Sequence, residues 1–161
     1  MKSYGGRVLF GKCDDYDTPI NAWEDVLQFV KKDTPLWLPF YNTGTAKELV
    51  EGLGYTDIFH EDRDFFTYWE NDRILIDNPP FSIKRKVLDY CWKQNKPFCL
   101  LLPCDTLERK YFKKYVKGLQ IIIPEKRYRY NDEAKVTPPF KSVWFCWGMN
   151  IQNNEMIIFL Y

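Results

Sequence analysis

Apolar and polar positions follow two different periods along the chain. In four stretches the apolar residues recur three or four positions apart, the spacing of an amphipathic helix, and they predict helices at about 18–32, 45–53, 83–95 and 105–117. Other short runs are apolar at nearly every position, which is typical of strands buried on both faces of a sheet. These runs predict strands at 36–40, 57–61, 73–77, 98–103, 120–123, 142–147 and 155–161.

Helices and strands alternate over the first three quarters of the chain, which predicts a three-layer α/β fold. The 161 residues suit one domain, so we expect a single domain over 1–161 and no separate target-recognition domain. In such sheets ligands bind at the carboxyl ends of the strands. The candidate binding loops are therefore those that follow Phe40, Glu61, Asp77 and Pro103.

Charge and histidine content narrow the function. The net charge of +1 excludes a molecule-wide attraction to polyanions, so any nucleic-acid surface has to be a local patch. His60 is the only histidine, which argues against a zinc site with several His ligands and against His-based acyl transfer. We expect no metal and give His60 no role.

Cysteine usage and hydropathy bear on the compartment. The odd number of cysteines and the lack of a Cys-x-x-Cys pair indicate reduced thiols, as in the cytoplasm or nucleus. The N-terminal residues lack the apolar run of a signal peptide, and no stretch approaches the roughly 20 apolar residues of a membrane span. We expect an intracellular protein. The cysteines are Cys13, Cys91, Cys99, Cys104 and Cys146.

The most informative stretch is ILIDNPPF, residues 74–81, a predicted buried strand that runs into a Pro-Pro turn. The side-chain oxygen of Asn78 and the carbonyl oxygen of Pro79 can each accept one N–H of an aromatic amino group, which aims the nitrogen lone pair at an electrophile. Pro79 and Pro80 stiffen the turn, and Phe81 offers a flat face to an extruded base. The plainer alternative is a turn that caps a strand. A second Pro-Pro-Phe, at 138–140, follows no strand, and we assign it to a loop.

This stretch resembles the [Asp/Asn/Ser]-Pro-Pro-[Tyr/Phe/Trp] signature of methyltransferases that act on adenine N6 or cytosine N4. From about residue 18 to residue 148 the chain resembles small viral and phage adenine-N6 DNA methyltransferases. The resemblance implies a Rossmann-like methyltransferase fold, whose sheet is mostly parallel with an antiparallel strand near the C-terminus. It also implies S-adenosylmethionine as cofactor, DNA as substrate and a catalytic motif made of Asn78, Pro79, Pro80 and Phe81.

The resemblance also implies a cofactor site. Thr18-Pro19 resembles an element before the first strand, and residues 38–45 (LPFYNTGT) resemble an Asp-Pro-Phe-x-Gly-x-Gly-Thr loop in which Leu38 replaces the acid and Asn42 the first glycine. In the family, an acid after the second strand binds the ribose of the cofactor, and this role suits Glu61 or Asp62. A later Asp-Phe pair flanks the adenine of the cofactor, and Asp64-Phe65 fits that role. The alternative for this acidic segment is a solvated loop. The implied cofactor-binding residues are Thr18, Pro19, Pro39, Phe40, Tyr41, Asn42, Gly44, Glu61, Asp62, Asp64, Phe65 and Asp77.

Three basic segments are candidates for contacts with nucleic acid. Lys84-Arg85-Lys86 follows the Pro-Pro turn, whereas the lysines and arginine of 109–117 suit a solvated helix face. Residues 126–130 alternate cations with Tyr128 and Tyr130, which an extended segment puts on one side, as in single-strand binding. RNA is not excluded, and with so little chain for reading bases we expect low specificity, a homodimer or a partner subunit. The predicted contact residues are Lys84, Arg85, Lys126, Arg127, Tyr128 and Arg129.

Three alternatives stay open. A methyltransferase fold that has lost catalysis would bind nucleic acid or a partner, and the replacements Leu38 and Asn42 motivate that hypothesis. An active enzyme would modify RNA, cytosine N4 or a protein glutamine in place of adenine in DNA. An unrelated small α/β domain would carry the Pro-Pro turn by coincidence.

Overall fold

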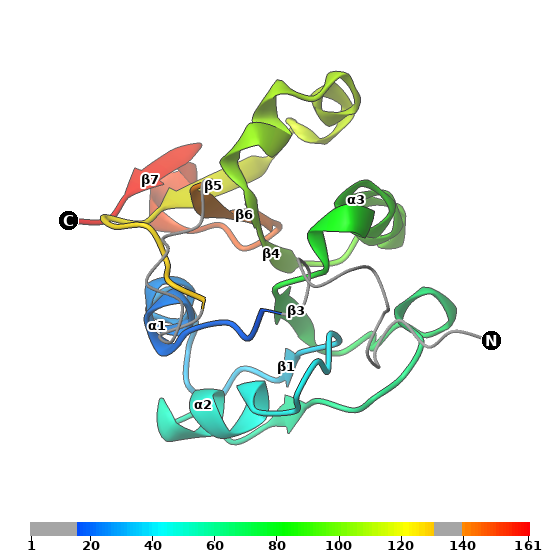
Figure 1. The fold of residues 1–161 in the computed structure, drawn as a ribbon, viewed down its shortest axis with the longest axis vertical. Helices are drawn as coiled ribbons and strands as arrows, with labels where there is room; N and C mark the ends of the chain where they lie inside the picture. The colour runs from blue at the N-terminus through cyan, green and yellow to red at the C-terminus, as the bar shows by residue number, and fades with distance from the viewer. Residues whose placement is uncertain (1–15, 131–139) are drawn as a thin grey trace.

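A single mixed sheet of seven strands forms the centre of the computed structural model, which describes residues 16–130 and 140–161. The strands stand side by side in the order β2-β1-β3-β4-β6-β5-β7 (Figure 1). All neighbours are parallel except β6, which runs antiparallel to both β4 and β5. The strands are β1 Leu36–Trp37, β2 Ile58–Phe59, β3 Ile74–Asp77, β4 Phe98–Pro103, β5 Leu119–Ile123, β6 Ser142–Trp147 and β7 Ile157–Phe159.

Helices cover both faces of this sheet, and they are short. Figure 1 shows α1 and α2 on one side of the strands and α3 on the other. The α-helices are α1 Ile20–Leu27, α2 Ala46–Gly52 and α3 Lys84–Gln94. The 3₁₀ helices are η1 Phe65–Thr67, η2 Phe81–Ile83, η3 Cys104–Glu108, η4 Lys110–Tyr115 and η5 Gln152–Asn154.

Two separate apolar cores lie on either side of the sheet, because successive strand residues point to opposite faces. Along β4, Leu101 packs in one core with Trp23 of α1, whereas Leu100 packs in the other with Val87 of α3 and Phe112 of η4. This arrangement confirms the predicted three-layer α/β fold. The prediction of a mostly parallel sheet with an antiparallel strand near the C-terminus is confirmed as well, by β6.

Several predicted elements differ in length or type. The strands predicted at 36–40 and 57–61 are only two residues long, and the backbone leaves β1 just before Pro39, which has no N–H to give to a neighbouring strand. The α-helix predicted at 105–117 is wrong. Arg109 is extended there (φ −74°, ψ 133°) between two 3₁₀ helices. Within the second of these helices the buried residues Phe112 and Tyr115 lie three positions apart, which suits a helix with three residues per turn.

The Pro-Pro turn is followed by η2 and then by α3, a helix that ends at a left-handed C-cap residue. After η2, α3 stops at Asn95, whose left-handed backbone (φ 54°, ψ 41°) is tolerated by asparagine better than by most residues.

Within residues 16–130 and 140–161, no helix is long and apolar enough to cross a membrane. Cys13, Pro138 and Pro139, which the sequence brought to attention, lie outside the described residues.

Candidate active site at the ends of β1 and β3

The predicted cofactor loop and the predicted catalytic turn lie next to each other, because they follow two neighbouring parallel strands. Trp37 at the end of β1 pairs with Leu75 of β3. The loop 38–45 and the turn 78–81 therefore leave the sheet at the same edge, where ligands bind in open α/β sheets.

Asp77, the last residue of β3, joins these two segments. Its side chain is buried, with 2% of its surface exposed. One carboxyl oxygen accepts a hydrogen bond from the backbone N–H of Phe40 (2.6 Å), and the other accepts one from the backbone N–H of Asn78 (2.8 Å). Burial raises the pKa of the Asp77 carboxyl to about 8, although both hydrogen bonds favour the ionised form. Asp77 thus fixes the start of the loop relative to the start of the turn.

Asn78 is half-buried, and its side chain has an unused acceptor. Its backbone N–H is bonded to Asp77, whereas its side-chain oxygen is buried and has no hydrogen-bond partner among the described residues. A buried polar atom without a partner is costly and calls for an explanation in a native fold. A cavity of about 10 Å³ opens beside it and is lined by Tyr16, Asn78, Pro79 and Phe81.

The loop after β1 is shaped by two residues with positive φ. Asn42 (φ 45°) and Gly44 (φ 84°) both occupy the left-handed region. A Cβ on Gly44 would lie 2.8 Å from the hydroxyl oxygen of Tyr41, so the ring of Tyr41 fills the space directly over this glycine. The same ring stacks on the imidazole of His60 at a centroid distance of 4.9 Å.

The exposed side chain of Asp17 stabilises the loop after β1 through hydrogen bonds. Its carboxylate accepts hydrogen bonds from the side chains of Asn42 (2.8 Å) and Thr43 (2.7 Å). A cavity of about 20 Å³, roughly the size of one water molecule, lies between this loop, the segment before α1 and the turn. It is lined by Tyr16, Asp17, Thr18, Phe40, Tyr41, Asn42, Thr45, Ala46, Asp77 and Asn78.

The structure therefore brings together six of the predicted site residues around one cavity. They come from the segment before α1, the loop after β1 and the end of β3. Two further predicted residues lie close by in the chain: Pro19 precedes α1 as its N-cap, and Pro39 is buried at the start of the loop. The six are Thr18, Phe40, Tyr41, Asn42, Asp77 and Asn78.

The acidic segment after β2 does not reach this cavity. Glu61 is exposed and pairs with Arg63 (2.7 Å), Asp62 is exposed, and Asp64 caps η1 by accepting a hydrogen bond from the backbone N–H of Phe66. Phe65 has 1% of its surface exposed and packs on Phe40 inside the core. The prediction that Phe65 flanks a cofactor needs correction, since its ring is already enclosed by other aromatic side chains.

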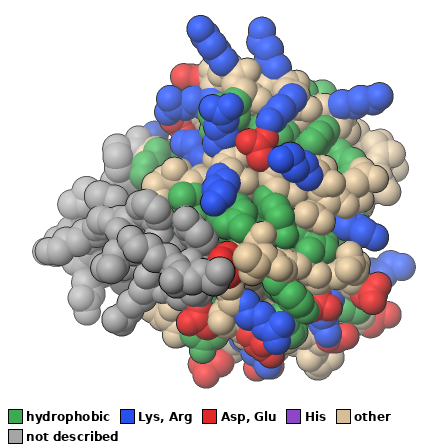
Figure 2. All heavy atoms as spheres, turned by 90° about the vertical axis from the view of Figure 1, so that its right-hand side faces the viewer, with side chains coloured by type: hydrophobic (Ala, Val, Ile, Leu, Met, Phe, Trp, Pro, Cys, Tyr) green, Lys and Arg blue, Asp and Glu red, His purple; other side chains and the backbone are tan. Residues whose placement is uncertain are grey.

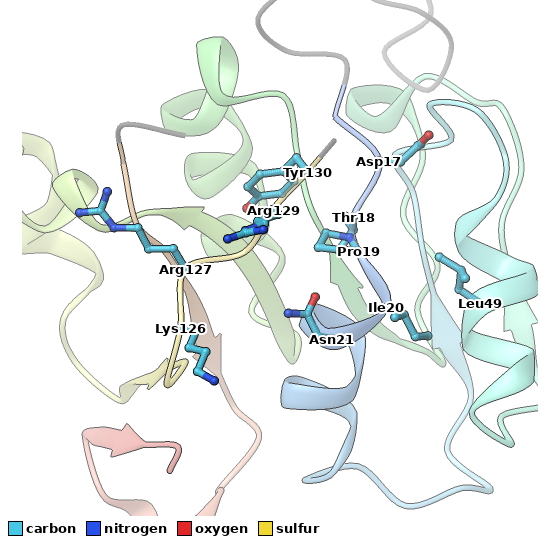
Figure 3. A pocket seen from close by; sticks show the side chains of 10 residues that line it. All are labelled: Asp17, Thr18, Pro19, Ile20, Asn21, Leu49, Lys126, Arg127, Arg129 and Tyr130. Atoms are coloured by element: carbon cyan, nitrogen blue, oxygen red, sulfur yellow. The ribbon is translucent and has the colours of Figure 1, made fainter. Parts of the chain in front are cut away.

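The segment after β5 borders a larger groove of about 800 Å³. Figure 3 shows Lys126, Arg127 and Arg129 on one side of it and Thr18, Pro19 and Leu49 on the other. As predicted, Tyr128 and Tyr130 share one side of the segment, but that side faces inward. Tyr128 is buried and donates a hydrogen bond to Asp25 (2.6 Å), so the prediction that it stacks on bases is wrong.

Several residues that border the turn or the loop were not predicted as part of the site, among them Tyr16, Phe140 and His60. Tyr16 lines both small cavities, and Phe140 packs edge-on against Phe81 with a centroid distance of 5.4 Å and an angle of 79°. His60 is buried, bonds through Nδ1 to the carbonyl oxygen of Leu38 (2.7 Å), and leaves Nε2 without a partner among the described residues. Burial also lowers the pKa of His60. Of these residues, only Phe140 belongs to a motif noted in the sequence, the second Pro-Pro-Phe, which we assigned to a loop.

Comparison with known proteins gives the fold. No model of a known protein family and no curated protein matches the sequence. A solved structure that matches is the crystal structure of the 23S rRNA methyltransferase ErmE, with 14% identity and a TM-score of 0.51. The match covers 82% of this chain and 68% of that one. This chain has a methyltransferase fold.

Within the methyltransferase fold, the two departures noted in the loop have local explanations. Asn42 replaces a glycine but adopts a positive φ, which asparagine tolerates. Leu38 replaces an acid and is fully buried in the core. A carboxyl group still contacts the loop, because Asp77 of the neighbouring strand β3 accepts a hydrogen bond from the backbone N–H of Phe40. Among residues 16–130 and 140–161, no cluster of three or more His, Cys, Asp or Glu side chains is arranged to hold a metal ion.

Proposed function

We propose that this protein is an S-adenosylmethionine-dependent methyltransferase that modifies the N6 amino group of adenine in a nucleic acid. The observation that carries the proposal is the side-chain oxygen of Asn78. It is buried, it has no partner among the described residues, and it lies at a proline-stiffened turn beside a cavity. The methyltransferase fold supports the same conclusion.

The chemistry of this turn suits an aromatic amino group. The lone pair of such a nitrogen is delocalised into the ring, so the nitrogen is a weak nucleophile. Asn78 accepts one N–H through its side chain, and the carbonyl oxygen of Pro79 accepts the other. Both acceptors are positioned before the reaction, because Asp77 holds the backbone of Asn78 and the prolines restrict the turn.

The residues of the loop fit the proposed cofactor after one rearrangement. When bound, S-adenosylmethionine supplies an electrophilic methyl group. The polar side chains of Asp17, Thr18 and Asn42 surround the cavity in which the cofactor would lie, next to Asn78. That cavity, of about 20 Å³, is too small for the cofactor, and we expect the ring of Tyr41, which lines the cavity and lies against Gly44, to move when the cofactor binds.

DNA is the first substrate we propose, on the resemblance of residues 18–148 to small adenine-N6 DNA methyltransferases. RNA is the second, because the matching solved structure is named as a methyltransferase of 23S rRNA. In either polymer the adenine has to leave the base stack before its amino group can reach Asn78.

The proposal is tested with Asn78→Ala. Removing the acceptor that shapes the amino group lowers kcat by about 100-fold or more, the usual effect of deleting one pre-positioned hydrogen-bonding group from an active site. Cofactor affinity, measured by calorimetry, stays close to the wild-type value. The matched control is Asn71→Ala, in an exposed turn just before β3, which keeps full activity.

The assay combines labelled cofactor with single- and double-stranded DNA, RNA and protein, followed by mass spectrometry of the nucleosides. N6-methyladenosine or its deoxy form in the wild type, formed at least about 100-fold more slowly by Asn78→Ala, supports the proposal. Methyl transfer by Asn78→Ala at a rate close to that of the wild type contradicts it. Cofactor binding without transfer to any substrate favours a non-catalytic binding module.

A further inference from the structure

The charges of this nearly neutral chain are strongly separated. Between residues 84 and 117 there are ten Lys and Arg against three Asp and Glu, a net charge of +7, so the rest of the chain carries a net charge of −6. Such separation creates a strong local potential even where the total charge is small. We call the surface formed by these cations the basic face. Its members are Lys84, Arg85, Lys86, Lys93, Lys96, Arg109, Lys110, Lys113, Lys114 and Lys117.

The fold gathers these cations on one side of the molecule. Helix α3 and the 3₁₀ helices η3 and η4 cover the same face of the sheet, since Val87 and Phe112 pack in one core. Contacts also join the two segments directly: Lys84 pairs with Asp105 (3.5 Å), and Lys114 pairs with Asp89. Figure 2 shows Lys and Arg gathered over the upper part of this side of the molecule.

Internal ion pairs do not use up this charge. Asp89 and Asp105 are each already in contact with cations of the basic face. By contrast, Lys110, Lys113 and Lys117 are exposed, and no carboxylate in the described part of the chain pairs with them. Arg85 lies over the ring of Tyr111, with 5.1 Å between its guanidinium carbon and the ring centroid.

The basic face begins beside the catalytic turn. Only η2 separates Asn78–Pro80 from α3, and η3 begins immediately after Pro103, where β4 ends. Because β3 and β4 are parallel neighbours, both segments leave the sheet at the edge that carries Asn78. A polymer lying on this face would therefore pass close to the turn.

The exposed groups of this face suit phosphates and not unpaired bases. Binding of single strands relies on exposed rings that stack on bases. The rings of the two segments are half-buried or buried, and Leu107 and Val116 are the large apolar side chains that the described residues expose here. Cations without exposed rings are typical of contact with the phosphate backbone of a double helix.

We propose that the basic face binds the phosphate backbone of a double-helical segment that flanks the target adenine. This inference rests on the proposed function, because it takes the turn at Asn78 as the place where the adenine is modified. It replaces the prediction of single-strand binding at residues 126–130, whose tyrosines are buried.

The test measures binding of labelled duplex oligonucleotides by fluorescence anisotropy, without cofactor, over a range of salt concentrations. The variant is Lys113→Gln/Lys117→Gln, and the matched control is Lys31→Gln/Lys47→Gln, two lysines outside the basic face. A third variant, Lys126→Gln/Arg129→Gln, removes two cations from the groove after β5.

We expect the first variant to bind duplex more weakly than the wild type. Log affinity falls as log salt concentration rises, and this negative slope should become shallower by about 0.9 for each phosphate that the variant no longer neutralises. The control should bind as the wild type does. An equal weakening in the control, unchanged binding in the first variant, a larger weakening in the groove variant, or a preference for single strands would each overturn the inference.

Asn78→Ala separates this inference from the proposed function. In that variant duplex binding should persist while methyl transfer slows by about 100-fold or more. A wild type that methylates oligonucleotides but binds them independently of the basic face would contradict the inference alone. A wild type that binds duplex through the basic face but transfers no methyl group would contradict the proposed function alone.

Discussion

At the scale of single residues, the central side chain of the site is Asp77. It is a buried carboxyl group that accepts hydrogen bonds from the first N–H of the turn and from an N–H of the neighbouring loop. A displacement of either segment would break one of these bonds. Asp77 therefore positions Asn78 and Phe40, and it also lines the cavity between the loop and the turn.

The raised pKa of Asp77 predicts how stability depends on pH. Between the ordinary value near 3.8 and the folded-state value of about 8, the unfolded chain has released this proton while the folded protein keeps it. Each pH unit in that range then lowers the free energy of unfolding by about 1.4 kcal/mol, and the stabilisation present at low pH is gone once the pH passes the folded-state value.

The variant Asp77→Asn removes this titration. We expect its free energy of unfolding, measured with urea across the same pH range, to fall less steeply with rising pH than that of the wild type. The exposed Asp72→Asn serves as control and should follow the wild type. Parallel curves for wild type and Asp77→Asn would show that the carboxyl group titrates normally in the folded protein.

Tyr41 gives a second prediction at this scale. Its ring covers Gly44, so opening the cofactor cavity costs free energy that is subtracted from binding. Tyr41→Ala should lower the Kd for S-adenosylmethionine roughly three- to tenfold, or by about 0.7–1.4 kcal/mol, as measured by calorimetry. Tyr41→Phe keeps the ring and should bind as the wild type does. Weaker binding by Tyr41→Ala would instead make the ring a direct contact of the cofactor.

At the scale of elements, the segment before β6 supports the turn after β3. Phe140 lies edge-on to Phe81, although 59 positions separate them in the chain. Aromatic pairs in this geometry contribute about 0.5–1.5 kcal/mol beyond the burial of their area. The contact orients the ring that we expect to stack on the adenine.

A double-mutant cycle tests this contact. The variants Phe81→Ala, Phe140→Ala and their combination should show a coupling energy of about 0.5–1.5 kcal/mol in urea unfolding. Phe140→Ala should also raise KM for the oligonucleotide, but by less than Phe81→Ala does, while cofactor affinity is unchanged. Additive effects on stability would show that the two rings do not support each other.

The sequence predicted those elements and site residues that depend on local pattern. A buried strand that ends in Asn-Pro-Pro-Phe is visible in eight consecutive letters, and so is the glycine-containing loop after Phe40. The period-two alternation of 126–130 predicted that Tyr128 and Tyr130 share a side. It did not say which side faces the core, because that depends on contacts with α1 far away in the chain, such as the one to Asp25.

The contacts that escaped prediction join residues distant in sequence. The hydrogen bond from Phe40 to Asp77 spans 37 positions, and the stacking of Tyr41 on His60 spans the whole of α2. Neither leaves a periodic pattern in the chain. The break at Arg109 was missed for another reason: a spacing of three and a spacing of three to four look alike over two turns, so a 3₁₀ segment resembles an α-helix.

At the scale of the whole molecule, separation of charge replaces total charge as the guide to partners. The net charge of +1 argues against a molecule-wide field, yet it conceals a segment, residues 84–117, with a net charge of +7. From the sequence alone, residues 109–117 suit a solvated helix face. The fold changes that interpretation, because it places these residues beside α3, the helix that begins just after the catalytic turn.

The position of β6 has a consequence for how the chain assembles. Strand β5 does not pair with β4, its predecessor in the sequence, because β6 lies between them and pairs with both. The ribosome therefore releases β5 and the segment after it before the strand that fastens them to the rest of the sheet exists. Residues 36–103 can associate early through parallel neighbours, whereas the half of the sheet that carries β5 and β7 waits for residues 142–147.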